Sequence, residues 1–251
     1  MWGLRKKLSR GSTSRKFVII IQMSRNISIA PGEFYHLYNR GTDKRDIFST
    51  EADHERFLAL LYLSNTNKSF HIDDVKKSQG STSRNLLECI DVEREENLIS
   101  ICAYCLMPNH FHLLVYEKNE HGISKFMQKL MTGYTMYFNN RHERSGALFQ
   151  GKFKATHANE DAFLKYLVSY IHLNPVKLIE PRWKENGIQD RQSAEKFLHQ
   201  YRYSSYLDYL GISRIESKIL TREALPNYFD DVKDFNAEMA DWLEYQKIYN
   251  A

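Results

Sequence analysis

The stretch Leu106–Val115, with the sequence LMPNHFHLLV, constrains the fold more than any other part of the chain. It predicts a β-strand that begins after the turn signal Pro108-Asn109. Side chains in a strand alternate between its two faces, so His110 and His112 project together. Two imidazoles in this arrangement can hold one divalent metal ion. Such a pattern more often reflects paired polar residues on a sheet face than a metal site. Other parts of the sequence are therefore needed to choose between these two interpretations.

A second informative segment, Asn159–Leu173, has the periodicity of a helix with one apolar face. Pro175 follows it and predicts its end. Tyr166, Tyr170 and Asn174 are spaced by four residues and share a face of this helix. The pattern sets a hydroxyl nucleophile beside a carboxamide, whose oxygen is a suitable third ligand for Mg²⁺ or Mn²⁺. For either tyrosine alone, ordinary packing between the helix and a sheet is the better interpretation.

Both segments resemble motifs of a known family. His110-Phe111-His112 resembles the His-hydrophobe-His (HUH) motif of single-strand DNA nucleases, and 170–177, YIHLNPVK, resembles the nucleophile helix of single-tyrosine insertion-sequence transposases. Within that group the chain resembles the REP-associated tyrosine transposases most. Further matches lie at 34–41, 148–154 and 203–206 and extend the resemblance over residues 33–211. The two core motifs are specific together and weak apart.

The resemblance implies a transposase that cleaves and rejoins single-stranded DNA near a hairpin. Tyr170 is the expected nucleophile, and the expected product is a 5′-phosphotyrosine link with a free 3′-hydroxyl. His110, His112 and Asn174 are the expected ligands of Mg²⁺ or Mn²⁺, which would polarise the scissile phosphate. The covalent link keeps the energy of the phosphodiester, so rejoining needs no nucleotide cofactor. The implied substrate is a repetitive palindromic or inverted-repeat hairpin, bound by a monomer or homodimer.

Basic residues flank these motifs and are candidates for contacts with the DNA backbone. They are Arg40, Lys44, Arg45, Lys152 and Lys154. Taken singly, each is more often an ordinary solvated charge. The net charge of +4 is compatible with nucleic acid without being diagnostic. Residues 1–16 carry six basic and no acidic residues, whereas 214–251 carry eight acidic and five basic residues, so the acidic tail should not lie along phosphates.

The order of predicted elements indicates an α+β fold. Strands and helices alternate as βαββαβ, which is typical of a ferredoxin-like sandwich with one antiparallel sheet. A helix follows and brings Tyr170 against that sheet. A helix at 51–63 should be capped by Ser49 or Thr50. The predicted strands are 34–39, 98–106, 110–117 and 153–157, and the other long helices are 123–142 and 159–173.

The chain divides into a catalytic domain with appended segments. We expect residues 23–178 to form the HUH transposase domain, with a polar insertion at about 65–97. Residues 1–22 are interpreted as a disordered arm or as a mis-assigned start, with Met23 as the true first residue. Residues 179–251 should form a helical C-terminal extension, in which no chemistry is recognisable.

Three cysteines argue against a disulfide framework and for a reducing compartment. The resemblance implies a cytoplasmic, nucleoid-associated bacterial protein. Cys102 and Cys105 form a CxxC motif that could suggest zinc. Residues three apart in a strand point to opposite faces, so we expect these two to be small core residues. The apolar run Phe17–Ile21 is far too short to span a membrane.

Three other functions stay open at this point. A non-catalytic regulator that binds DNA or RNA hairpins could use the same scaffold. A two-tyrosine enzyme could use Tyr166 together with Tyr170, although packing or base stacking suits Tyr166 better. A structural α+β protein could carry both motifs by coincidence, which two matched motifs in order disfavour.

Overall fold

The computed structural model describes residues 28–69, 72, 87, 90, 96–228 and 231–244. The predicted arm at 1–22, the alternative start at Met23 and most of the predicted insertion at 65–97 lie outside the described residues. No helix in the described ranges combines the length and apolarity needed to cross a bilayer.

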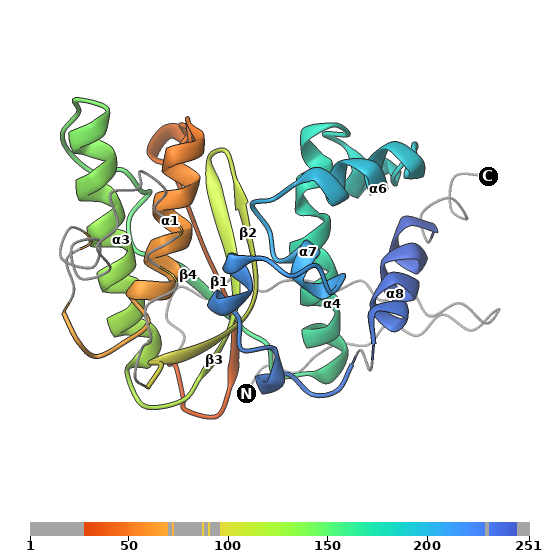
Figure 1. Ribbon diagram of the computed structural model, residues 1–251, viewed down its shortest axis with the longest axis horizontal. Helices are drawn as coiled ribbons and strands as arrows, with labels where there is room; N and C mark the ends of the chain where they lie inside the picture. Colours follow the sequence, from red (N-terminus) through yellow and green to blue (C-terminus); the bar gives the residue numbers. More distant parts are fainter. Residues whose placement is uncertain are drawn as a thin grey trace, which may run out of the picture.

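One four-stranded sheet forms the centre of the molecule (Figure 1). Its strands are β1 (Phe34–Arg40), β2 (Ile99–Met107), β3 (His110–Glu117) and β4 (Lys154–His157). They are ordered β2-β3-β1-β4, and every neighbouring pair is antiparallel. Together with the helices between them they follow the order βαββαβ. The predicted ferredoxin-like α+β sandwich is therefore confirmed.

Helices α1 (Glu51–Leu63) and α3 (Gly122–Arg141) cover one face of this sheet (Figure 1). Thr50 begins α1 with a capping box, in which its hydroxyl accepts the backbone N–H of Asp53 and the Asp53 carboxylate accepts the backbone N–H of Thr50. This settles the choice between the two predicted caps. A short 3₁₀ turn, η1 (Thr42–Lys44), connects β1 to this region.

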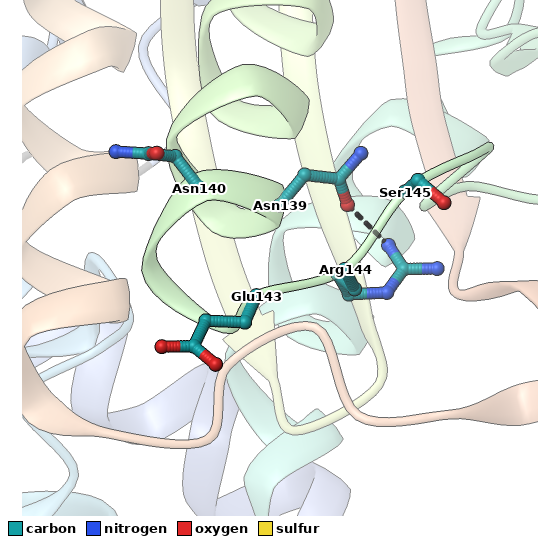
Figure 2. Close-up of a pocket in the computed structure, with 5 residues that line it drawn as sticks. All are labelled: Asn139, Asn140, Glu143, Arg144 and Ser145. Atoms are coloured by element: carbon teal, nitrogen blue, oxygen red, sulfur yellow. Dashed lines mark hydrogen bonds between the residues drawn. The ribbon is translucent and has the colours of Figure 1, made fainter.

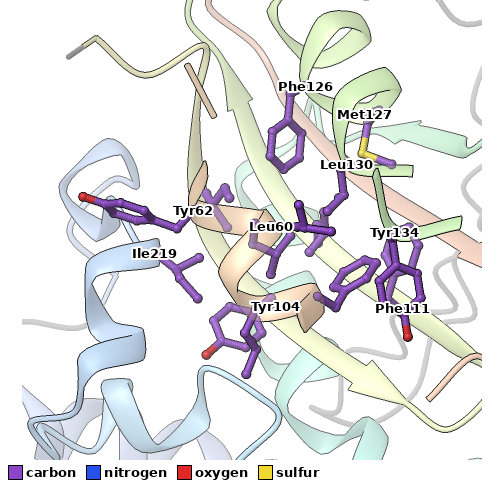
Figure 3. Close-up of a cluster of buried hydrophobic side chains, with 14 of the residues drawn as sticks. Leu60, Tyr62, Tyr104, Phe111, Phe126, Met127, Leu130, Tyr134 and Ile219 are labelled. Carbon is purple, nitrogen blue, oxygen red and sulfur yellow. The ribbon is translucent and has the colours of Figure 1, made fainter. Parts of the chain in front are cut away.

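The core beneath these two helices is aromatic and aliphatic. Figure 3 shows Phe126, Leu130 and Tyr134 of α3 gathered with Leu60 of α1 and Phe111 of β3, all of them buried. Phe111 faces this core from between the two histidines of the HUH motif. Strand alternation therefore directs both histidines to the other face of the sheet.

Helix α4 (Asp161–Leu173) covers that other face, on the right of the sheet in Figure 1. Leu167, Val168 and Ile171 bury its apolar side against β2 and β3. A 3₁₀ turn, η3 (Asn174–Leu178), follows directly. Asn174 precedes a proline but keeps helical dihedrals of φ −54° and ψ −38°, so the helical course continues past the predicted end. Asn174 consequently stays one turn after Tyr170 on the same side of α4.

The segment after η3 is helical, and its helices pack on β2, on α1, on α4 and on one another. They are α5 (Trp183–Asn186), α6 (Arg191–Gln200), α7 (Tyr206–Tyr209), η4 (Ile215–Ile219), η5 (Arg222–Ala224) and α8 (Val232–Glu244). Two backbone amides, Leu106 N–H to the Tyr203 carbonyl and Thr221 N–H to the Ile101 carbonyl, tie this segment to the outer edge of β2. The edge of the sheet is therefore covered by the chain itself.

The structure corrects one prediction in β2. The register shifts between Ile101 and Ala103, where the strand bulges. The bulge turns Cys102 onto the same face as Cys105, so the two thiols do not lie on opposite faces as a regular strand would require. Both cysteines are free and buried in the α4-side core, as predicted. Burial raises the pKa of each thiol, which keeps both in the neutral form.

Candidate active site

The candidate site lies on the sheet face that α4 covers. His110 and His112 share that face as predicted, with ring centroids 5.1 Å apart and ring planes perpendicular. The neighbouring strand β1 adds His36 and Tyr38 to the same face, and the register pairs Tyr38 with His112. The His36 and His112 rings are stacked with centroids 5.0 Å apart.

Each HUH histidine has a hydrogen-bond partner for one ring nitrogen. His110 Nδ1 lies 2.6 Å from the Oδ1 of Asn109, and the Asn109 amide donates in turn to the carbonyl of Lys44. His112 Nδ1 lies 2.9 Å from Nε2 of His36. Since Oδ1 can only accept, His110 carries its proton on Nδ1 and keeps Nε2 as a free donor of electrons. Such fixed tautomers are typical of metal-binding histidines.

Both histidines are held in the neutral form. Burial lowers the pKa of His110 to about 3, and the charges of Arg40, Lys177 and Lys184 act in the same direction. Burial also lowers the pKa of His112 well below its usual value, with a further contribution from His36. A neutral imidazole is the form that binds a metal, so burial prepares both rings for this role.

Tyr170 projects from α4 toward the histidines. Its ring meets that of His112 edge-on with centroids 5.6 Å apart, and that of His36 with centroids 6.0 Å apart. Tyr166 stacks on Tyr170 one turn earlier, at 5.7 Å, and on Phe163 at 6.0 Å. Of the two tyrosines of the sequence pattern, Tyr170 is therefore the one that the fold brings against the HUH motif.

The Tyr170 hydroxyl has polar and charged neighbours. Burial raises its pKa, while a hydrogen bond from the Asn174 side chain and the charges of Lys177 and Arg40 oppose that rise. Lys184 donates from Nζ to the hydroxyl over 2.9 Å. Desolvation lowers the pKa of Lys184 itself to about 8, which still leaves the ammonium as the main form at pH 7.

Asn174 is almost fully buried, and its amide donates to the carbonyl of Tyr170 over 2.7 Å. This bond fixes the side chain beside Tyr170. Over the described ranges, no three His, Cys, Asp or Glu side chains form a group that could hold a metal. The site offers two neutral imidazoles, and Asn174 offers an amide oxygen one helical turn after Tyr170. These donors fit a hard cation such as Mg²⁺ or Mn²⁺ whose shell is completed by substrate oxygens.

The chain is similar in sequence to one known protein family. Residues 71–174 match the family described as "Transposase IS200 like", a range that contains the HUH motif, Tyr170 and Asn174. The match confirms the predicted resemblance to insertion-sequence transposases over these 104 of the 251 residues. No curated protein sequence matches the chain.

Several solved chains are similar to this one. One of them has 13% sequence identity and a TM-score of 0.45, over 78% of this chain and 90% of that chain. It is described as "Structure of the REP associates tyrosine transposase bound to a REP hairpin".

The five basic residues predicted to contact DNA lie at different distances from this site. Arg40 ends β1 opposite His110 in the register, and Lys154 of β4 has its Nζ 6.0 Å from the centroid of the Tyr38 ring. Lys44 and Lys152 are exposed in the turns that follow β1 and precede β4. Arg45 pairs with Asp43 over 3.2 Å on the surface.

A separate polar hollow of about 440 Å³ lies at the C-terminal end of α3. Asn139, Asn140, Glu143, Arg144 and Ser145 line it, and Arg144 donates to Asn139 (Figure 2). Because α3 packs on the opposite face of the sheet, this hollow is distinct from the candidate active site.

Sequence reasoning missed four residues of the site: His36, Asn109, Lys177 and Lys184. Alternation in β1 could have set His36 on one face with Tyr38, but only the pairing of β1 with β3 brings it to His112. Lys184 lies fourteen residues beyond Tyr170, and no motif marks it.

Proposed function

We propose that this chain is a metal-dependent transposase and endonuclease that cleaves and rejoins single-stranded DNA near hairpins through a 5′-phosphotyrosine intermediate. The main support for this proposal is that Tyr170 lies against the HUH motif. The ring centroids of Tyr170 and His112 are 5.6 Å apart. A hydroxyl nucleophile next to a pair of neutral imidazoles suits phosphoryl transfer by a metal-assisted route.

Tyr170 attacks the scissile phosphorus with its hydroxyl oxygen. The P–O3′ bond breaks, its electron pair stays on the 3′ oxygen, and that oxygen takes a proton from water. The Tyr170 proton passes to solvent water. Rejoining reverses these steps, with a 3′-hydroxyl as the attacking group. The family resemblance supports this polarity.

His110, His112 and Asn174 are the residues that would hold Mg²⁺ or Mn²⁺. Bound there, the ion supplies Lewis-acid polarisation of the scissile phosphate and offsets its charge. Asn109 and His36 orient the two imidazoles so that one ring nitrogen of each stays available.

The substrate is single-stranded DNA that carries a hairpin. The sequence resemblance supports the hairpin, and the basic residues around the site support contacts with phosphates. A single strand can turn so that its phosphorus lies about 3 Å from the Tyr170 oxygen and in line with the leaving group, whereas a stacked duplex must first be melted.

The test uses an oligonucleotide hairpin with a single-stranded flank, labelled at one end, and the same sequence as a perfect duplex. With Mg²⁺ we expect the single strand to give a protein–DNA adduct on a denaturing gel together with a fragment ending in a 3′-hydroxyl. The duplex should give neither product. Equal cleavage of both substrates would indicate a general nuclease, and hairpin binding without any cleavage would favour a non-catalytic regulator.

A further inference from the structure

The segment after the nucleophile helix is anchored so that one lysine returns to Tyr170. Trp183 is buried in the core on the α4 side of the sheet. The Glu180 carboxylate accepts the backbone N–H groups of Gln189 and Asp190 over 2.8 and 3.0 Å. Gly187, with φ at 78°, ends α5 with an N–H bond to the carbonyl of Trp183. These contacts fix the turn that carries Lys184.

Lys184 makes its closest contacts with Tyr170. Its Nζ lies 2.9 Å from the Tyr170 hydroxyl oxygen and 4.2 Å from the centroid of the Tyr170 ring. The same ammonium lies 5.7 Å from the centroid of the Trp183 ring. Within the described part of the chain, Lys184 forms no ion pair with a carboxylate. The ammonium of Lys184 therefore interacts with the phenol oxygen and not with a carboxylate in a surface salt bridge.

We propose that Lys184 is a catalytic residue of this site, whose ammonium donates a hydrogen bond to the Tyr170 oxygen and stabilises negative charge there while the bond to phosphorus forms and breaks. The inference rests on the proposed function and adds a residue from outside the segment 71–174 that matches the transposase family.

The charge on the phenol oxygen explains why a cation is useful in both directions. In cleavage the Tyr170 oxygen loses its proton to water and forms the bond to phosphorus, and the P–O3′ electron pair goes to the 3′ oxygen. In rejoining the 3′-hydroxyl loses its proton to water and its oxygen attacks phosphorus. The electron pair of the broken P–O(Tyr170) bond returns to the phenol oxygen, which then takes a proton from water. Both steps share a transition state with partial negative charge on that oxygen, and a fixed donor lowers its energy.

The experiment compares Lys184→Met, which keeps an apolar stem against the ring, with Lys184→Arg, which keeps the charge. Lys196→Ala is the control, because Lys196 is an exposed lysine of α6 in the same extension. Single-turnover rates of adduct formation and of rejoining are measured with bound hairpin DNA and saturating Mg²⁺. We expect Lys184→Met to slow both rates by about 100-fold with little change in the Kd for the hairpin. Lys184→Arg should recover much of the loss, and Lys196→Ala should match the wild type.

A second arm separates charge from structure. Methylammonium added to Lys184→Ala should restore part of the rate, since it supplies a donor in the vacated space, and it should not affect the wild type. Unchanged rates in Lys184→Met would overturn the inference, as would slow Lys184→Arg and Lys184→Ala variants that methylammonium does not rescue. If the wild type forms no adduct at all, the proposed function fails, which is a different outcome from a wild type and Lys184→Met that react equally fast.

Discussion

His36 Nε2 lies 2.9 Å from His112 Nδ1, so a histidine of β1 holds the second histidine of the HUH motif. When His112 donates from Nδ1 to His36, Nε2 of His112 is the ring nitrogen available to a metal. Partners of this kind orient metal-binding imidazoles, and their loss typically costs 10- to 100-fold in metal affinity or activity.

Replacing His36 by leucine removes both ring nitrogens and keeps a buried apolar side chain. We expect affinity for Mn²⁺ to fall by about 10- to 100-fold, measured by isothermal titration or by the EPR signal of free Mn²⁺. Circular dichroism should show a folded protein. Wild-type Mn²⁺ affinity in a folded His36→Leu protein would mean that His36 does not orient His112.

Asn109 should orient His110 as His36 orients His112. Its Oδ1 lies 2.6 Å from His110 Nδ1, and its amide donates to the Lys44 carbonyl. Asn109→Ala frees the His110 ring to rotate, so we expect slower cleavage at limiting Mn²⁺ that excess Mn²⁺ partly restores. Asn109→Asp keeps the acceptor and should be milder. Equal losses in both variants would assign the effect to the turn and not to the His110 bond.

Binding of hairpin DNA should depend strongly on salt, because phosphate contacts release counterions. Lys154, near Tyr38 and the site, is expected to contribute to the slope of log K against log salt, and Lys154→Ala should reduce it by about one. Lys125→Ala, on α3 across the sheet, should leave the slope unchanged. Arg45→Ala should reduce the slope less than Lys154→Ala does, because Arg45 already pairs with Asp43. An equal drop in slope for Lys125→Ala and Lys154→Ala would refute this assignment of the DNA surface.

Stability should decrease on acidification in part through His54. Its ring stacks on Tyr203 with centroids 3.7 Å apart, its Nδ1 bonds to the Thr50 carbonyl over 3.0 Å, and burial lowers its pKa. As pH falls below the ordinary value of 6.5 the unfolded chain takes up the proton before the folded one does, so the free energy of unfolding falls. The slope from this group is at most about 1.4 kcal/mol per pH unit.

His54→Phe keeps the stacking and removes the titrating nitrogen. Urea unfolding between pH 7.5 and pH 5 should therefore show a shallower loss of stability in the variant, with a cost of about 1 kcal/mol at pH 7.5 from the lost hydrogen bond. Parallel pH curves for the two proteins would show that His54 titrates alike in the folded and unfolded chains.

The sequence was sufficient for the parts of this molecule that local patterns determine. Alternation in 106–115 predicted the shared face of His110 and His112, and helical spacing predicted that of Tyr170 and Asn174. Sequence patterns failed where strand pairing or a β-bulge determines which residues share a face. The bulge in β2 reverses the side on which Cys102 lies, and no pattern in the sequence marks it. His36 and Lys184 reach the site through strand register and through the fold of the C-terminal segment, and neither is a local property.

Tyr170 is assigned as the nucleophile beside the HUH motif, and mapping the covalent adduct is the direct test of this assignment. Wild type, Tyr170→Phe and Tyr166→Phe are incubated with labelled single-stranded hairpin DNA and Mg²⁺, and the covalent adduct is digested and mapped by mass spectrometry. Phenylalanine keeps the ring and its packing and removes the hydroxyl. We expect DNA attached at Tyr170 in the wild type and in Tyr166→Phe, and no adduct in Tyr170→Phe although this variant still binds the hairpin. An adduct that persists in Tyr170→Phe and disappears in Tyr166→Phe would contradict the assignment.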